Sequence, residues 1–167
     1  ADAFIAICQC PLCAGKDTPE RGTRGHLSDY VWDYVNRVAT ETAKTHPDRK
    51  ILCCAYGSYT LPPAKIDKLH PNVVVAVVGG RRPTANQPKQ MAEAKALRDA
   101  WRAKTDNKIL FFENYPFTGR GYCMPSYVPH AMGTSINDTK AYSMGEDIWL
   151  TLGTRLDAPG YNHFNVY

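Results

Sequence analysis

The side chains best placed to do chemistry in this sequence are those that directly follow short apolar runs. Glu113 is the first polar residue after the unbroken apolar run 109–112, which itself follows a polar turn at 105–107. A short apolar run bounded by turn residues is typical of a strand buried on both faces of a parallel sheet. Side chains just beyond the carboxyl end of such a strand lie where α/β folds build their sites. Glu113 is therefore a candidate acid, base or nucleophile; the alternative is a carboxylate that only ends the strand or faces water.

Three further predicted strands, 51–56, 73–78 and 148–152, also end beside polar or aromatic side chains. If the strands are parallel, these side chains all emerge at one edge of the sheet. Aromatic rings stack on sugar rings, and carboxylates act as acid, base or nucleophile in glycoside hydrolysis, so this edge favours a carbohydrate site. The alternative is that each is an ordinary loop residue. The expected sugar contacts are Tyr56, Arg81, Asn114 and Tyr115.

Glycoside hydrolysis normally needs a second carboxylate. Asp2 is our candidate, provided that it lies at the end of a strand that precedes this sequence; the alternative is a disordered terminus. Glu146 and Asp147 come before the predicted strand 148–152, so we expect them at the opposite edge of the sheet and do not choose them.

A dense cysteine cluster offers a different chemistry. Cys8, Cys10 and Cys13 are spaced C-x-C-x-x-C, which suits zinc if a fourth ligand completes the site. His26 and Cys123 are the candidates for that ligand. A disulfide and packed or free thiols are the alternatives to zinc, and we expect no cofactor at the carbohydrate site.

Hydrophobic periodicity predicts the elements that position these groups. Helices are expected at 28–46, 88–104 and 126–136, and they alternate with the strands. This order is typical of an α/β fold with a parallel sheet built from β/α repeats, either open or part of a (β/α)8 barrel. The predicted buried helix faces comprise Val31, Tyr34, Val35, Val38 and Thr42, and Met91, Ala94, Leu97 and Trp101.

The composition of the chain argues against nucleic acid and membranes as partners. The 20 Lys and Arg residues, against 16 Asp and Glu, are scattered, so no basic stripe for nucleic acid is present. No apolar run approaches the roughly 18–20 residues of a membrane helix. The sequence starts at Ala1 rather than Met, and this processed start favours an exported protein, periplasmic or extracellular.

The motifs also resemble those of a known family. The segment from Cys8 to Cys13, the helix segment from Ser28 to Ala39, the strand segment from His46 to Tyr56, the pair Pro62-Pro63 and the segment from Pro71 to Val75 occur in the family's order. They are similar to a bacterial family of unknown function whose members are glycoside-hydrolase-like (β/α)8 barrels, related to the α-glucuronidase group. The final segment 161–167 resembles the start of that family's last barrel helix.

The resemblance implies that residues 1–167 are one domain, the C-terminal half of a TIM (β/α)8 barrel from the end of strand four through strand eight. By the same resemblance, Asp2 corresponds to the acid after strand four, and Glu113 to the second carboxylate on strand seven. Half a barrel exposes sheet edges, so we expect self-association or pairing with the missing half.

We therefore expect a glycoside hydrolase with Glu113 as base or nucleophile. The first alternative is a non-catalytic carbohydrate-binding or scaffold domain, in which the aromatic edge binds glycan but the carboxylates are not paired. The second is a metal-binding protein built on the cysteine cluster.

Overall fold

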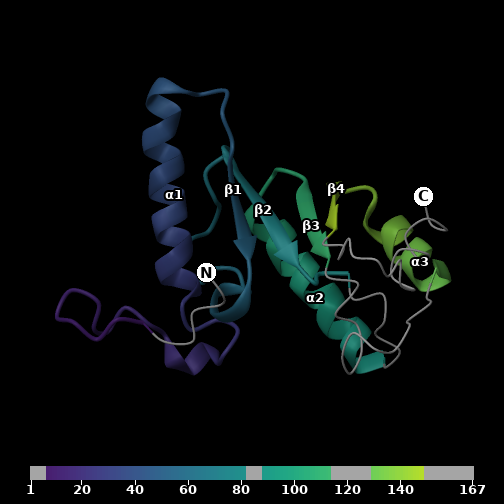
Figure 1. Cartoon of the computed structure of the whole chain (residues 1–167), viewed down its shortest axis with the longest axis horizontal. Coiled ribbons are helices and arrows are strands. Elements are labelled where there is room, and N and C mark those ends of the chain that lie inside the picture. Colours follow the sequence, from purple (N-terminus) through teal and green to yellow (C-terminus); the bar gives the residue numbers. More distant parts are fainter. Residues whose placement is uncertain (1–6, 82–87, 114–128, 149–167) are drawn as a thin grey trace, which may run out of the picture.

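The computed structural model describes residues 7–81, 88–113 and 129–148, and these form the α/β fold that the sequence predicts (Figure 1). Asp2, Asn114 and Tyr115 lie outside the described residues. The strands are β1 Ile51–Ala55, β2 Val73–Val78, β3 Ile109–Glu113 and β4 Ser143–Ile148. The helices are α1 Ser28–Thr45, α2 Pro88–Lys104 and α3 Pro129–Thr139, with short 3₁₀ turns η1 Pro19–Arg21 and η2 Gly57–Tyr59.

The four strands form one parallel sheet in the order β1-β2-β3-β4. Doubly wound sheets reverse their strand order at a switch point, whereas these strands follow their order in the chain. Consecutive right-handed crossovers keep the connecting helices on one face of such a sheet. The sheet is thus consistent with a partial barrel, and the carboxyl ends of all four strands lie at the same edge.

One face of the sheet is covered by α1 and α2, and the main core lies there. The rings of Trp32 in α1 and Trp101 in α2 meet with centroids 4.7 Å apart, and both side chains are fully buried. Each indole N–H donates to a backbone carbonyl of the loop after β1, that of Tyr59 at 3.1 Å and that of Thr60 at 2.9 Å. The strand side chains in this core are Ala55, Val73, Val75, Val77, Ile109 and Phe111.

The bounds of α2 are those predicted, but two residues of the predicted buried faces are exposed. Tyr34 is 60% exposed and Met91 is 57% exposed. In α1 the buried stripe runs through Trp32, Val35 and Ala39; it shares Val35 with the predicted stripe but is turned about 80° around the helix from it. The tryptophan has the larger apolar surface to bury, whereas a tyrosine carries a hydroxyl that favours the surface. None of the described helices is both long and apolar enough to cross a membrane.

The last described strand differs from the prediction. We predicted a strand at 148–152, but β4 is Ser143–Ile148, and residues 149–152 lie outside the described part of the chain. The sequence Ser-Met-Gly-Glu-Asp-Ile contains no apolar run, so pairing with β3 rather than local hydrophobicity makes it a strand. Gly145 has φ +148°, a conformation open to glycine, and a register shift lies opposite it between Ile109 and Leu110. The prediction that Glu146 and Asp147 precede the strand was wrong, because both lie within it.

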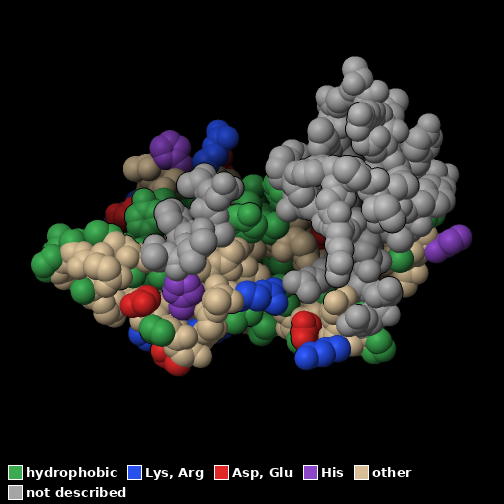
Figure 2. Space-filling view, turned by 60° about the horizontal axis from the view of Figure 1, so that its bottom comes forward, with side chains coloured by type: hydrophobic (Ala, Val, Ile, Leu, Met, Phe, Trp, Pro, Cys, Tyr) green, Lys and Arg blue, Asp and Glu red, His purple; other side chains and the backbone are tan. Residues whose placement is uncertain are grey.

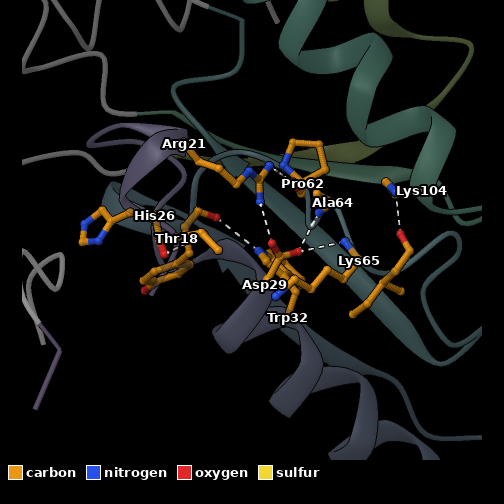
Figure 3. A network of polar contacts seen from close by, with 11 residues as sticks. Thr18, Arg21, His26, Asp29, Trp32, Pro62, Ala64, Lys65 and Lys104 are labelled. Carbon is orange, nitrogen blue, oxygen red and sulfur yellow. Dashed lines mark hydrogen bonds and ion pairs between the residues drawn. The ribbon is translucent and has the colours of Figure 1, made fainter. Parts of the chain in front are cut away.

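A polar network around Asp29 fixes the loop before α1 to the loop after β1 (Figure 3). The Asp29 carboxylate accepts hydrogen bonds from the backbone N–H groups of Ala64 at 2.6 Å and Lys65 at 3.0 Å. Its second oxygen lies 3.4 Å from Arg21, whose guanidinium also donates to the Pro62 carbonyl at 2.6 Å. The segment that carries the cysteine cluster therefore extends from an anchored loop at the edge where β1 ends.

Candidate functional site at the carboxyl end of the sheet

Glu113, the last residue of β3, is a buried carboxylate with a defined partner. Glu113 is only 2% exposed, and its Oε1 accepts a hydrogen bond from the backbone N–H of Arg81 at 2.8 Å. Burial raises the pKa of Glu113 to about 7; the nearby Glu146 also raises it, while the Arg81 N–H and the guanidinium groups of Arg81 and Arg98 lower it. The carboxyl group is therefore able to exchange a proton near neutral pH.

Strand alternation places Glu113 on the helix-covered face. Successive side chains of a strand point to opposite faces, so Glu113 shares the face of Ile109 and Phe111, which lie in the core. Its partner in β4 is Ile148. The carboxyl group thus lies at the end of the sheet, on the side of the helices.

The side chain of Arg81 is held by an ion pair and two hydrogen bonds. Its Nη1 lies 2.7 Å from Oε1 of Glu146, in an ion pair whose side chains are 3% and 4% exposed. Its Nε donates to Thr139 Oγ1 at 3.0 Å, and its Nη2 donates to Ser143 Oγ at 3.1 Å. The guanidinium also lies 4.4 Å from the centre of the Phe111 ring. Arg81 therefore joins the end of β2 to α3 and β4.

A second arginine, Arg98 of α2, reaches the same edge. Its Nη1 donates to the carbonyl of Gly80 at 2.9 Å, and its buried Nε has no hydrogen-bond partner among the residues described. A Cβ at Gly80 would lie 2.7 Å from Cγ1 of Val77 and 3.2 Å from Phe111, which is too close for another residue without a shift. Glycine thus allows the chain after β2 to pass over the core and present the Arg81 N–H to Glu113.

A cavity of about 470 Å³ opens beside the ion pair. Arg81 and Glu146 contribute to its wall, and Lys140, in the turn directly after α3, adds a second cation. A cavity with two cations and a carboxylate could take a small polar or anionic molecule. Its other lining residues come from α3 and β4: Ile136, Ser143, Met144, Gly145 and Ile148.

The opposite face of the sheet carries a separate carboxylate. Asp147 of β4 pairs with Phe112 of β3, which alternates with Glu113 and so points away from the helices. Asp147 is exposed. The pKa of the Cys54 thiol is raised mainly by burial of that thiol and, to a smaller extent, by the charge of Asp147. The two faces of the sheet thus each bear an acidic group near the carboxyl edge.

The structure places three of the six predicted site residues. It brings Glu113 and Arg81 into contact, whereas Tyr56 follows β1 and is 36% exposed. The pairing of Asp2 with Glu113 stays a prediction, as do the sugar contacts of Asn114 and Tyr115. Sequence reasoning missed Glu146, because only its pairing opposite Phe111 shows that it faces Arg81.

The cysteine cluster forms as a group in space. The sulfur atoms of Cys8, Cys10 and Cys13 all lie within 4.8 Å of one another, and among the residues described these three are the only group with the geometry to hold a metal. His26, a predicted fourth ligand, is not part of the group, and Cys123 lies outside the described ranges.

The cluster and the strand cysteines differ in acidity. Hydrogen bonds from the Cys8 thiol, the Leu12 N–H, and the thiol and N–H of Cys13 lower the pKa of Cys10. The shared hydrogen bond with Cys10 raises the pKa of Cys13. In β1, burial raises the pKa of Cys53 to about 11. All five described cysteines are free thiols.

Comparison with known protein families gives a match over most of the chain. A model of the family described as Domain of unknown function (DUF4838) matches residues 2–147. No curated protein and no solved structure matches the chain. The matched range includes the four strands and three helices up to Asp147.

Proposed function

We propose that this chain, which belongs to the DUF4838 family of domains of unknown function, is part of a (β/α)8-barrel glycoside hydrolase in which Glu113 is the proton-transferring carboxyl group. The sequential parallel strand order supports the barrel. Family membership itself carries no reaction, so the proposal depends on the carboxyl edge of the sheet.

The observation that carries the proposal is the position of Glu113. It ends a strand with neighbours on both sides in the sheet, is buried, and is held by one backbone N–H. With a pKa raised to about 7 by burial, the group is about half protonated at neutral pH, which suits both delivery and removal of a proton. A protonated carboxyl group can donate to the glycosidic oxygen while a second carboxylate acts as base or nucleophile.

Several carboxylates remain as candidates for the second role. The sequence predicts Asp2 as the partner, but with Asp2 as the acid and Glu113 as base or nucleophile. The proposal exchanges those two roles, because the raised pKa of Glu113 suits proton delivery. Among the described residues Glu146 is the alternative, since its charge raises the pKa of Glu113. Its carboxylate is already engaged in a buried ion pair with Arg81, however, and this contact favours a structural role. A carboxyl separation of about 5–5.5 Å would predict retention of configuration, and about 6.5–9.5 Å inversion.

A second candidate function is a non-catalytic carbohydrate-binding or scaffold domain. The observation that favours it is that the groups around Glu113 are shielded from solvent. The side chains of Arg81 and Glu146 are 3% and 4% exposed, and Glu113 faces the helices. In this reading the cluster holds the sheet edge together, and sugar is bound by exposed groups such as Tyr56.

Glu113→Gln separates the two candidates, because the amide keeps the size of the carboxyl group but cannot transfer the proton. We expect hydrolysis of a panel of aryl glycosides, uronides included, to fall by at least about 100-fold, at the lower end of general acid–base contributions, with glycan binding retained. Glu93→Gln on the exposed side of α2 is the matched control and should leave the rate unchanged.

Unchanged hydrolysis in Glu113→Gln would overturn the role of Glu113. Glycan binding by the wild-type protein without hydrolysis of any glycoside would instead support the binding domain.

A further inference from the structure

The cysteine cluster lies in a segment that projects from the body of the molecule. In Figure 1 the segment extends beside the start of α1, and in Figure 2 the same end of the molecule carries hydrophobic side chains, a class that includes cysteine, on its surface. Cys8 is exposed, and Cys10 and Cys13 are half-buried. An ion from solvent can therefore reach all three sulfur atoms.

The chain turns tightly around Cys10. The backbone N–H groups of Cys13 and Ala14 both donate to the Cys10 carbonyl at 2.9 Å, and Gly15 then takes a positive φ of 73°. The turn therefore holds the side chains of Cys10 and Cys13 close to that of Cys8. A metal binds cysteine in its thiolate form, so three thiols held this close together are a candidate metal site.

We propose that Cys8, Cys10 and Cys13 bind a zinc ion as three thiolate ligands. With Zn–S bonds of about 2.3 Å, two sulfurs of a tetrahedral site lie about 3.8 Å apart. The three sulfurs lie within 4.8 Å, so side-chain rotations that move them by about 1 Å complete the geometry. Each thiol gives its proton to solvent as the ion binds.

The ligand set selects the ion. Thiolates are soft ligands that favour zinc and other thiophilic metals, whereas Ca²⁺ and Mg²⁺ require oxygen ligands. Zinc needs no redox partner and accepts four ligands. The described residues supply three, so the fourth position takes water or a donor from outside them. This site is independent of Glu113, and its test does not depend on any glycosidase activity.

The experiment is a competition titration of the reduced full chain with Zn²⁺ against a chromophoric chelator, followed by Co²⁺ absorption. We expect one zinc per chain and a thiolate-to-cobalt charge-transfer band. Loss of a group that only hydrogen-bonds a metal ligand weakens metal binding by up to about 100-fold. Cys10→Ser removes a ligand itself, so it should weaken zinc binding by more than that. Cys54→Ser, which changes a half-buried cysteine of β1, is the matched control and should bind zinc like the wild type.

X-ray absorption of the zinc-loaded wild type counts the sulfur ligands without any variant, which covers the case of a misfolded Cys10→Ser chain. Three sulfurs at about 2.3 Å support the proposal. Binding of less than one zinc per chain, zinc lost equally in Cys54→Ser, or a zinc shell of nitrogen and oxygen would each overturn it. A Cys10–Cys13 disulfide that persists in the presence of a thiol reductant would overturn it as well.

Discussion

The carboxylate cluster around Glu113 and the cysteine cluster around Cys10 hold titratable groups in opposite environments. Glu113 is buried at the end of β3, and burial raises its pKa to about 7, against the hydrogen bond from Arg81. Cys10 lies near the surface, and hydrogen bonds from the Cys8 thiol and from its own turn lower its pKa. In the first region desolvation outweighs hydrogen bonding, and in the second hydrogen bonding outweighs desolvation. The comparison shows that the local surroundings decide the direction of the shift: burial raises the pKa of one acid, and hydrogen bonds lower the pKa of the other.

The largest expected effect comes from removing the cation of the buried cluster. Arg81→Met removes the guanidinium from a buried ion pair with Glu146 and takes away one of the two guanidinium groups that lower the pKa of Glu113, so we expect the free energy of unfolding at pH 8 to fall by about 3–5 kcal/mol. Urea denaturation followed by circular dichroism measures the change. Arg37→Met is the control, since it breaks an ion pair whose side chains are 69% and 58% exposed and should cost less than about 1 kcal/mol. Equal losses in the two variants would contradict a buried cluster.

The next effect is a pH dependence of stability that belongs to Glu113. Its folded pKa of about 7 lies above the ordinary glutamate value of 4.5, so its stabilising contribution is complete below pH 4.5 and is lost as the pH rises through 7. The loss amounts to about 3 kcal/mol for a shift of this size. Glu113→Gln cannot titrate, so it should be more stable than the wild type at pH 8 and should lack this part of the slope. Urea midpoints of both proteins from pH 4.5 to 8.5 provide the test, and parallel curves would contradict it.

The smallest effect changes reactivity and leaves stability alone. In chelator-treated protein at pH 7, iodoacetamide should alkylate Cys10 faster than Cys53, because the thiolate is the reactive form and burial raises the pKa of Cys53 to about 11. Peptide mass spectrometry at short reaction times measures both rates in one sample. Equal rates in the folded protein would remove the distinction between the two groups of cysteines.

Much of the fold follows from local sequence signals. β2 is a run of valines around one alanine, and Pro88 to Lys104 forms the helix that its spacing predicts. β4 could not be found in this way, because Ser143–Ile148 is polar and becomes a strand through its ladder with β3. The burial of Trp32 in place of the predicted Tyr34 has a similar origin. Each of the two residues lies at helical spacing from other apolar residues of the segment, and only the packing of Trp32 against Trp101 shows which one faces the core.

The candidate site was predictable as a location but not as a set of contacts. Glu113 follows from its place after an apolar run. The ion pair of Arg81 with Glu146 does not, because it joins side chains 65 positions apart through the pairing of β3 with β4. The grouping of the three cysteines follows from their spacing alone, since one tight turn brings them together.

The most direct test of the central claim is a titration of the Glu113 side chain itself. In protein labelled with ¹³C at the glutamate carboxyl groups, Glu113→Gln identifies the resonance by its loss. We expect that resonance to titrate with a midpoint near pH 7, the value to which burial raises its pKa. A midpoint near 4.5, the ordinary value of a glutamate, would contradict both the buried environment and the proposed role of Glu113 in proton transfer.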